Sequence, residues 1–349
     1  MKLITAVTIL IVFIACSCID QIKEKDLNIG SGQMPMMAKD GKGNMHIVYG
    51  TGDSIMYSFS LNGGKTFSSP VLISLLPQLA ASHTRGPQIA ATTEGIVVTA
   101  CNSLGNIFSY AKDQTAKWGQ TAKVNDVDNV AKENLMALAA YGKNVFAVWL
   151  DLRNKHNEIF GAKSIDGGKT WSKNILVYTS PDSTVCECCK PSVAVKGSDV
   201  YVMFRNWLNG NRDMYLISSS DGGDTFGQAQ KLGNESWALN GCPMDGGGLV
   251  INKNGNPETI WRRHNKIYAC EPGKPEREIG EGKSCVIESV NGKDVYAWTE
   301  NGEVIILNLQ GLRKNLGKGS LPVIKAINNE HIICVWENEN QIHSIVLEL

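Results

Sequence analysis

The sequence predicts an all-β protein built as a β-propeller, for which we favour seven blades over the alternative of six. Two observations predict this fold: an eight-residue turn motif occurs three times, and short strand-like segments recur at a nearly regular spacing. With 35 glycines and 43% hydrophobic residues, the 349-residue chain has the composition of a globular protein with many turns. Because such repeats build one ring, we expect one folded domain rather than the two that the length suggests.

The turn motif reads Ser-x-Asp/Asn-Gly-Gly-x-Thr-aromatic. Its copies span residues 60–67, 164–171 and 219–226. The Gly-Gly pair supplies positive φ in a tight turn, whereas the Ser hydroxyl and the Asp or Asn side chain satisfy turn amides. The aromatic residue is expected to pack back onto the sheet. The motif therefore predicts a structural and not a catalytic role for its Asp or Asn position, which is Asn62, Asp166 and Asp221.

The strand-like segments mark seven units, each with a characteristic residue near the end of its second strand. These residues are Tyr49, Ala100, Trp149, Phe204, Trp261, Trp298 and Trp336. The seventh unit reaches the C-terminus after about three strands, so we expect the N-terminal segment 25–30 to supply the missing strand and close the ring. If the segment 285–313 is not a blade of its own, the ring has six blades.

The turn motif resembles the Asp-box, or BNR repeat, of sialidase-like β-propellers. Four further segments strengthen the likeness to a branch of bacterial BNR-repeat proteins that are often lipoproteins. They are WLDLRN at 149–154, CECCKP at 186–191, FRN…NRD at 204–213 and GCPMDG at 241–246. The resemblance spans nearly the whole mature chain. It implies the propeller fold and leaves open whether the protein is an enzyme.

Active sialidases hold the substrate carboxylate with three arginines and use a tyrosine nucleophile polarised by a glutamate, with an aspartate as acid/base. The resemblance implies that Arg85, Arg205 and Arg262 are the candidates for the arginine triad. Arg85 lies in a Thr-Arg-Gly-Pro segment that lacks the aromatic residue of the family's usual phrase, and no Tyr–Glu pair can be placed. An exo-sialidase-type glycoside hydrolase is therefore an alternative function rather than the leading one.

The N-terminus has the pattern of a targeting segment. Lys2 precedes an apolar run over residues 3–14 that is too short to span a bilayer as a mature helix. The run leads into Ala-Cys-Ser-Cys, and small residues before a cysteine resemble the bacterial lipobox. We therefore expect lipidation at Cys16 or Cys18, with an ordinary cleaved signal peptide as the alternative.

This pattern divides the chain into a lipoprotein signal segment over 1–18, a charged tether over 19–26 and the propeller over 27–349. We expect an extracytoplasmic protein of the bacterial cell envelope, anchored to membrane lipid through its acylated cysteine. The formal net charge is zero and the sequence contains no basic run, so we expect no nucleic-acid partner. We also expect a monomer.

A ligand site is expected on one face of the ring. In such propellers the turn motifs lie on one face, and the opposite face collects the loops that lead into each innermost strand and those that join second and third strands. Arginines in these loops suit a carboxylate or sulfate, so we expect an anionic ligand such as a glycan at an Arg-rich channel mouth. The alternative is that these charges are solvated or pair across blades. The candidates are Arg85, Asp151, Arg153, Arg205, Arg212, Asp213, Asp245, Arg262 and His264.

A group of cysteines forms a second candidate site. Cys186, Cys188 and Cys189 precede the fourth innermost strand, and Cys242 precedes the fifth. In an oxidising compartment disulfides are the default, so we expect the CECC segment to be joined to Cys242 across two blades. Zinc or copper bound by thiolates is the alternative. That alternative leaves a third function open, a metal- or thiol-handling or protein-interaction propeller.

Overall fold

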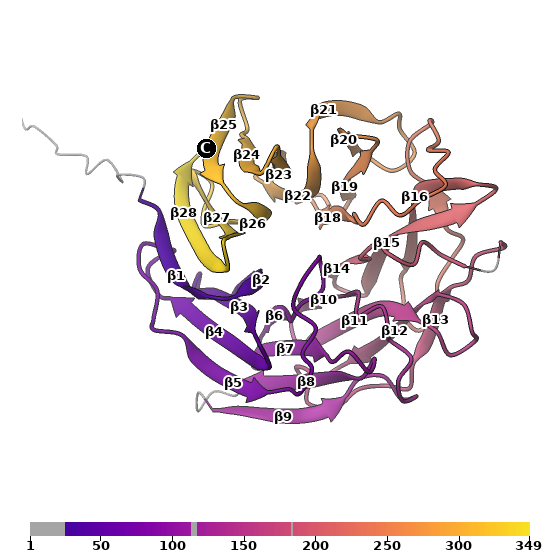
Figure 1. Ribbon diagram of the computed structural model, residues 1–349, viewed down its shortest axis with the longest axis horizontal. Helices are drawn as coiled ribbons and strands as arrows, with labels where there is room; N and C mark the ends of the chain where they lie inside the picture. The colour runs from indigo at the N-terminus through magenta and orange to yellow at the C-terminus, as the bar shows by residue number, and fades with distance from the viewer. Residues whose placement is uncertain (1–24, 113–116, 183) are drawn as a thin grey trace, which may run out of the picture.

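The structure, a computed structural model, describes residues 25–112, 117–182 and 184–349, and these residues form seven four-stranded antiparallel sheets arranged in a ring (Figure 1). The protein is a seven-bladed β-propeller, as predicted. The expected signal segment, both candidate lipidation cysteines and most of the expected tether lie outside the described residues. Across the described ranges, the structure has no helix of the length and apolarity needed to cross a membrane.

Six sheets take their four strands in chain order, from the innermost strand outward. The first three consist of β2 (Gln33–Lys39), β3 (Met45–Thr51), β4 (Ser54–Ser60) and β5 (Val71–Leu75); β6 (Gln88–Thr92), β7 (Gly95–Cys101), β8 (Ile107–Lys112) and β9 (Trp118–Lys123); and β10 (Met136–Tyr141), β11 (Asn144–Asp151), β12 (Glu158–Ser164) and β13 (Ile175–Tyr178). The next three consist of β14 (Ser192–Lys196), β15 (Asp199–Leu208), β16 (Asn211–Ser219) and β17 (Gln230–Lys231); β18 (Gly247–Ile251), β19 (Pro257–Arg263), β20 (Lys266–Cys270) and β21 (Arg277–Glu281); and β22 (Lys283–Val290), β23 (Lys293–Glu300), β24 (Glu303–Leu307) and β25 (Arg313–Lys318). The segment whose status decided between six and seven blades is thus a blade of its own.

The seventh sheet joins the two ends of the chain. It combines β26 (Ser320–Ala326), β27 (His331–Asn338) and β28 (Gln341–Glu348) with the N-terminal β1 (Leu27–Ser31) as its outermost strand. Leu27 pairs with Ser344 and Ser31 with Gln341 in this antiparallel ladder. β26 also contacts β2, the first innermost strand, so the ring is closed both by packing and by a shared sheet. The predicted N-terminal closing strand is confirmed.

The hydrophobic core lies between neighbouring blades rather than within any one of them. Each of the seven junctions contains a buried apolar cluster that is drawn from the facing sheets. Between the third and fourth blades, for example, Phe146 of β11 packs with Val202 and Phe204 of β15. This arrangement follows from sheets that are apolar on both faces, because each blade must bury two surfaces.

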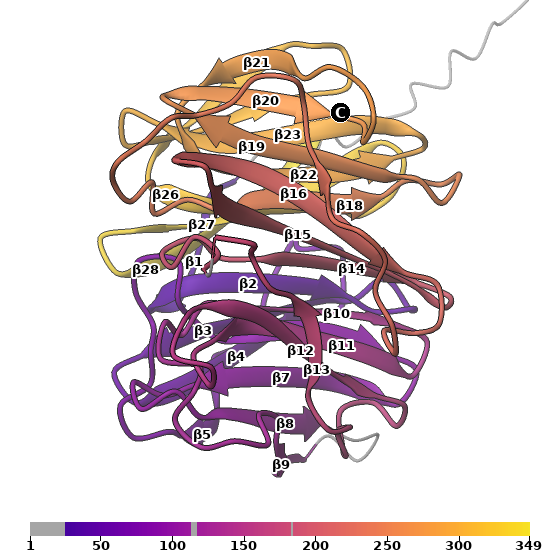
Figure 2. The same cartoon turned by 90° about the vertical axis from the view of Figure 1, so that its right-hand side faces the viewer.

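Antiparallel strands place the hairpins on two faces, and in Figure 2 the hairpins gather at the two sides of the view. We call the turn face the one that carries the turn motifs and the hairpins between first and second strands. On this face Gly167 N donates a hydrogen bond to Lys143 O, and Gly222 N donates one to Ser198 O. We call the opposite one the mouth face, because the innermost strands begin there.

The hydrogen bonds of the turn motif match the predicted pattern in all three copies. In the second copy, Asp166 Oδ1 accepts a hydrogen bond of 2.9 Å from Thr170 N and one of 2.7 Å from Ser164 Oγ, and Ser164 Oγ accepts one of 2.9 Å from Gly168 N. Partial burial raises the pKa of Asp166, but the hydrogen bonds outweigh it and hold that pKa below the usual value. The carboxylate is therefore an integral part of the turn.

The second glycine of each motif lies against the preceding blade. A Cβ atom placed on Gly64, Gly168 or Gly223 would lie 2.3 to 2.5 Å from a side chain there. These side chains are Ile333 of β27, Val97 of β7 and Phe146 of β11. The turn motif therefore forms a contact between blades as well as a hairpin. Positive φ favours glycine at this position, and the close approach of the preceding blade leaves no room for a Cβ atom.

Asp166→Ala is expected to lower the free energy of unfolding by about 1–2 kcal/mol, because Ser164 and two turn amides lose their acceptor. It should leave ligand affinity unchanged, since the turn face is remote from the mouth. Denaturant unfolding and ligand titration of the same preparation check both expectations. An unchanged midpoint with lost binding would place the ligand site on the turn face.

Candidate functional site

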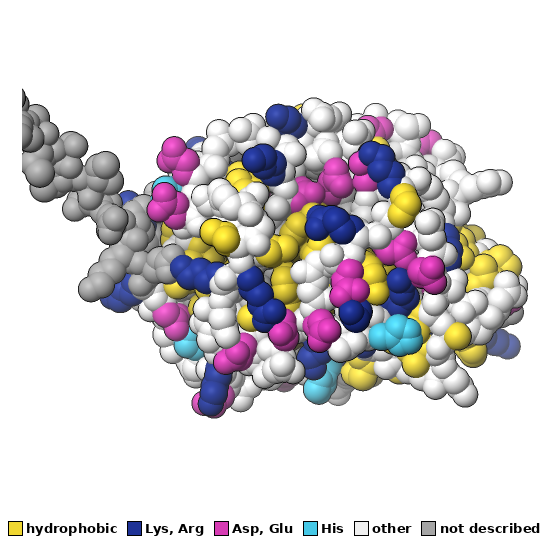
Figure 3. Space-filling model, turned by 90° about the horizontal axis from the view of Figure 1, so that it is seen from above, with side chains coloured by type: hydrophobic (Ala, Val, Ile, Leu, Met, Phe, Trp, Pro, Cys, Tyr) yellow, Lys and Arg dark blue, Asp and Glu magenta, His cyan; other side chains and the backbone are white. Residues whose placement is uncertain are grey.

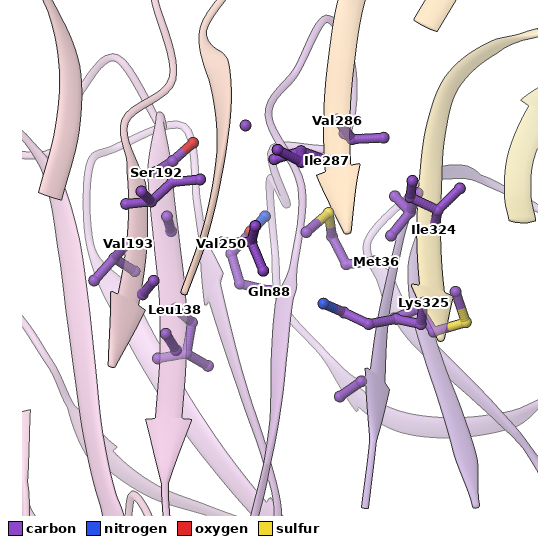
Figure 4. Close-up of a pocket in the computed structure, with 18 of the residues that line it drawn as sticks. Met36, Gln88, Leu138, Ser192, Val193, Val250, Val286, Ile287, Ile324 and Lys325 are labelled. Atoms are coloured by element: carbon purple, nitrogen blue, oxygen red, sulfur yellow. The ribbon is translucent and has the colours of Figure 1, made fainter. Parts of the chain in front are cut away.

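The channel at the centre of the ring contains a cavity of about 780 Å³ that the innermost strands of all seven sheets line. Its wall is mostly short and apolar, and Figure 4 shows Leu138, Val250 and Ile324 among the side chains around it. Such a wall supplies shape but no charge. Recognition of an anion must therefore come from the polar groups at the two ends of the channel.

At the turn-face end, three lysines tie neighbouring blades together. Lys39 Nζ and Lys196 Nζ each donate to two backbone carbonyls of an adjacent blade's hairpin. Lys325 forms an ion pair of 2.9 Å with Glu288. The hydrogen-bonding capacity of these ammonium groups is thus largely used within the ring.

At the mouth-face end, Lys190 reaches across the channel. It lies just before β14 in the fourth blade, and its Nζ donates a hydrogen bond of 2.9 Å to Gln88 Oε1 in the second blade. Met36 Sδ of the first blade lies 3.8 Å from the same nitrogen. Within the described residues no carboxylate lies within ion-pair distance of this ammonium. Burial lowers the pKa of Lys190 to about 8.

The backbone at this end is held in an unusual conformation. Non-glycine residues with positive φ lie at the start of several innermost strands or just before them, and they include Met34 at 56°, Thr84 at 69°, Ser284 at 55° and Leu321 at 55°. Such residues cost of order 1 kcal/mol each and tend to cluster at binding sites. Their amides are held in place: Met34 N, for instance, donates to Glu337 Oε2 at 2.7 Å. The backbone at the mouth is therefore held in one conformation by hydrogen bonds, although several of its residues have strained φ angles.

The predicted ligand residues fall into separate groups rather than one cluster. Asp151 and Arg153 form an ion pair of 2.9 Å, and Arg153 also bonds Asp126 and Asn174 at the junction with the second blade. Asp151 is fully buried and accepts a hydrogen bond from Trp149 Nε1. These residues therefore join the third blade to the loop that follows the second, and their hydrogen bonds go to protein groups rather than to a ligand.

Arg85 forms a second group at the rim of the mouth. Its Nε donates to the Glu133 carbonyl at 2.8 Å, and its Nη2 lies 4.0 Å from the Glu133 carboxylate. Burial raises the pKa of Glu133, and the charge of Arg85 opposes that effect. The Arg85 side chain is about one quarter exposed, so its guanidinium faces solvent with a long and weak ion pair.

Arg205 is buried, with 2% of its surface exposed, and it is bonded to backbone carbonyls on all sides. Its Nε, Nη1 and Nη2 donate to the carbonyl oxygens of Asp245, Arg212 and Arg262. The side chain thus joins the fourth and fifth blades. A guanidinium in this setting positions the backbone, and Arg205 is not among the residues that line the channel cavity.

Trp237 lies at the centre of a third group, which sequence reasoning missed. It sits in the loop between the fourth and fifth blades, and its ring is within 6 Å of the guanidinium carbons of Arg205 and Arg262 and stacks obliquely on His264. Arg262 Nε also lies 3.3 Å from Asp245 Oδ2. Burial raises the pKa of Asp245, while the charges of Arg262 and Arg205 act in the opposite direction.

Arg212 and Asp213 of β16 lie beside the loop that carries Trp237 and the cysteine cluster. Asp213 Oδ1 accepts a hydrogen bond of 2.8 Å from Trp237 N. Arg212 Nη1 donates to Cys186 Sγ at 3.0 Å and lies 3.2 Å from Glu187 Oε2. These two candidates therefore hold the loop and the cysteine cluster, and neither is directed into the channel.

The cysteine cluster contains the predicted link between blades. A disulfide joins Cys188 to Cys242 with a Cα–Cα distance of 6.2 Å, which confirms the expected staple across the fourth and fifth blades. Cys186 and Cys189 remain as thiols, with their sulfurs 3.3 Å apart. Their sulfurs lie 3.7 and 4.0 Å from Cys188 Sγ.

The donor set does not fit structural zinc while this disulfide stands. The sulfurs of Cys186, Cys188 and Cys189 are close enough to share a metal ion. Structural zinc takes four ligands, and thiolates rather than disulfide sulfurs bind it. The bridge leaves two thiols, so the cluster is better described as a dithiol beside a disulfide.

The surroundings of two strand tyrosines, Tyr49 and Tyr296, do not favour a role as a sialidase-type nucleophile. Burial raises the pKa values of Tyr49 and Tyr296 to about 12, whereas a tyrosine nucleophile needs a base that favours its ionised form. Tyr49 is also almost fully buried in the core between the seventh and first blades.

The side of the ring seen in Figure 3 carries charges of both signs. Figure 3 shows Lys and Arg side chains interspersed with Asp and Glu on the side of the ring seen from above. Most arginines of the mouth have a carboxylate partner, as Arg262 has in Asp245 and Arg85 in Glu133. Among the mouth-face arginines with described positions, Arg205 has no carboxylate within ion-pair distance, and its donors go to backbone carbonyls. Lys190 also has an amide and a thioether as its neighbours. The position of Lys190 just before an innermost strand predicts a charge at the mouth, but the sequence does not show which groups the ammonium meets there.

The sequence matches no protein-family model and no curated protein. Solved structures share the fold. The BP39L lectin from Burkholderia pseudomallei superposes with a TM-score of 0.64 over 92% of this chain and 97% of the lectin, at 9% identity. The α-L-arabinanase of Penicillium chrysogenum complexed with arabinobiose gives 0.53 over 93% and 97% at 11% identity, and the α-L-arabinofuranosidase of Fusarium graminearum complexed with arabinobiose gives 0.52 over 93% and 97% at 12% identity. At these identities the similarity shows that this chain shares their propeller architecture.

Proposed function

We propose that the protein is a lipid-anchored, extracytoplasmic propeller that binds a small anionic ligand, a carboxylated glycan, at the mouth-face end of its channel. The observation that carries this proposal is the Lys190 ammonium, which spans the mouth with an amide and a thioether as neighbours and no carboxylate partner among the described residues. A carboxylate that reached this ammonium would form a charge-assisted hydrogen bond in a partly desolvated site.

The surroundings of Lys190 favour a ligand of sugar size. The cavity of about 780 Å³ lies within the usual range for a small-molecule site. Polar groups of Gln88, Thr84 and Ser284 lie among its lining residues, and Asp245 adds a carboxylate at the same end. The lectin and arabinan-degrading enzymes that share the fold have sugar ligands or substrates by name, which agrees with a glycan.

The arginines contribute less directly than the sequence suggests. Arg85, partly exposed and weakly paired, is the arginine that we include among the ligand contacts. We leave Arg153, Arg205 and Arg212 out, because their side chains are less exposed than that of Arg85 and bond to neighbouring protein groups. The proposed anion site therefore depends on one lysine and one arginine rather than an arginine triad.

Lys190→Met is expected to weaken binding of sialyllactose by about 10- to 100-fold, because the loss of one charge-assisted hydrogen bond costs roughly 1.5–3 kcal/mol. Isothermal titration of the purified protein with sialyllactose, glucuronic-acid disaccharides and lactose measures this effect. Binding of the acidic sugars should also weaken between pH 7 and pH 9, since the Lys190 pKa of about 8 means that the ammonium loses its proton in this interval.

Lys196→Met is the matched control, because Lys196 lies at the other end of the same channel and is bonded to backbone carbonyls. It should leave the affinity unchanged. Equal affinity for lactose and sialyllactose would contradict an anion site. Release of sugar from a fluorogenic sialoside would instead favour the hydrolase alternative.

Replacement of both Cys16 and Cys18 by serine is expected to move the protein from the membrane fraction to the soluble fraction, or to block its maturation. Stable anchoring needs more than one acyl chain, and a lipidated N-terminal cysteine carries several. Fractionation and detergent partitioning of the wild-type and double-mutant proteins measure the shift. Membrane association that is the same in both proteins would contradict the anchor.

A further inference from the structure

We propose that Cys186, Cys188, Cys189 and Cys242 form a thiol–disulfide exchange centre, in which the disulfide moves between the Cys188–Cys242 pair and the Cys186–Cys189 pair. This centre is separate from the proposed ligand site and does not depend on it. The motive is that four cysteines from two blades occupy one cluster, two of them bridged and two of them free.

The distances allow both steps of such an exchange. Cys186 Sγ lies 3.7 Å from Cys188 Sγ, close to van der Waals contact with one sulfur of the bridge. It lies 3.3 Å from Cys189 Sγ, the thiol that would complete the new bond. Cys186 and Cys189 also have the Cys-x-x-Cys spacing that is typical of redox-active pairs.

The charges around the cluster favour Cys186 as the attacking thiolate. Arg212 Nη1 donates to its sulfur at 3.0 Å. The hydrogen bond with Cys189 and the charges of Arg212 and Arg205 outweigh burial and lower the pKa of Cys186 to about 7. Burial raises the pKa of Cys189 well above its usual value. One thiol of the pair is thus prepared as the nucleophile and the other as its later partner.

The exchange balances without an oxidant. The Cys186 thiolate attacks Cys188 Sγ, so that a Cys186–Cys188 bond forms, the Cys188–Cys242 bond breaks and the electron pair leaves on Cys242 Sγ. Cys189 transfers its proton through solvent to the Cys242 thiolate and attacks Cys186 Sγ. A Cys186–Cys189 bond then forms, and Cys188 leaves as a thiolate that takes up the proton that Cys186 had lost. One disulfide and two thiols stand on each side.

The exchange changes what the protein presents to solvent. Cys186 and Cys189 are buried, whereas Cys242 is exposed. Movement of the bridge would therefore hide the disulfide, remove the covalent link between the fourth blade and the loop that carries Cys242, and expose a free thiol at Cys242. The Cys242 thiolate would attack one sulfur of a partner protein's disulfide, so that a mixed disulfide forms, the partner's S–S bond breaks and its other sulfur leaves as a thiolate. This reaction assigns disulfide-bonded proteins as the class of substrate.

Alkylation of native protein tests the proposal. Metal-free protein is incubated with N-ethylmaleimide without reductant, digested with trypsin and mapped without reduction. Cys186, Cys188 and Cys189 share the peptide 174–196, because the Lys190–Pro191 bond resists trypsin, and Cys242 lies in the peptide 232–253. We expect Cys242 to be alkylated progressively while the peptide 174–196 gains an internal disulfide.

Cys186→Ser should slow alkylation of Cys242 by at least about tenfold, because the attacking thiolate is absent. Cys334→Ser is the matched control, since Cys334 is equally buried but lies in the core between the sixth and seventh blades, and it should behave like the wild type. If Cys186→Ser does not fold, Cys189→Ser serves instead, and it should yield alkylated Cys242 with a Cys186–Cys188 bridge. A Cys242 that stays bridged in the wild type, equal alkylation rates in the wild type and Cys186→Ser, or stoichiometric metal held by the thiols would each overturn the proposal.

Discussion

Gly223→Ala is expected to lower the free energy of unfolding by about 2–5 kcal/mol, a large effect for a single methyl group. Gly223 has a φ of +89°, which costs an alanine roughly 1–2 kcal/mol. The added Cβ would also lie 2.3 Å from Phe146, which is buried between the third and fourth blades and has no room to move. Overpacking of this kind adds about 1–3 kcal/mol.

Gly222→Ala is the matched control in the same turn. Gly222 has a similar φ of +78°, but a Cβ placed there meets no atom within 4 Å. It should therefore cost only the conformational part, about 1–2 kcal/mol. Denaturant unfolding of the two variants measures the difference. Equal midpoints would mean that the turn motif acts only within its own hairpin and that the contact between blades contributes little.

Arg205→Met is expected to destabilise the protein by about 3–5 kcal/mol, because it leaves three carbonyl groups of two blades without their donor in a buried site. Methionine keeps much of the length and apolar contact of the side chain, so the effect reports mainly on the lost hydrogen bonds and charge. Thermal and denaturant unfolding of the purified variant measure it.

Arg313→Met provides the comparison for Arg205, because Arg313 is half exposed in its ion pair with Glu300. A surface pair of this kind contributes about 0–1 kcal/mol, so this variant should unfold almost as the wild type does. If Arg205→Met were as stable as the wild type but no longer bound acidic sugars, Arg205 would be a ligand residue, as the resemblance to sialidases implied.

The periodic pattern of the sequence was sufficient to predict the propeller fold. The turn motif and the spacing of the second strands predicted seven blades, and the missing fourth strand of the last unit predicted that segment 25–30 closes the ring. These features are local: glycine conformations, turn hydrogen bonds and strand alternation depend on neighbours in the chain. The pairing of the CECC segment with Cys242 was also predictable, since both precede innermost strands of consecutive units.

The roles of the charged residues were decided only by the tertiary structure. Arg205 and Arg262 carry the same chemistry in the sequence, yet one is bonded to three carbonyls in the interior and the other faces Asp245 near the mouth. Lys190 became the proposed anion contact because its ammonium reaches the second blade, more than 100 residues away in the chain. Likewise, Gly64, Gly168 and Gly223 have no room for a Cβ atom because a side chain of the neighbouring blade lies against them. Such roles depend on which groups from distant segments meet and which are left without a partner, and composition and spacing do not contain that information.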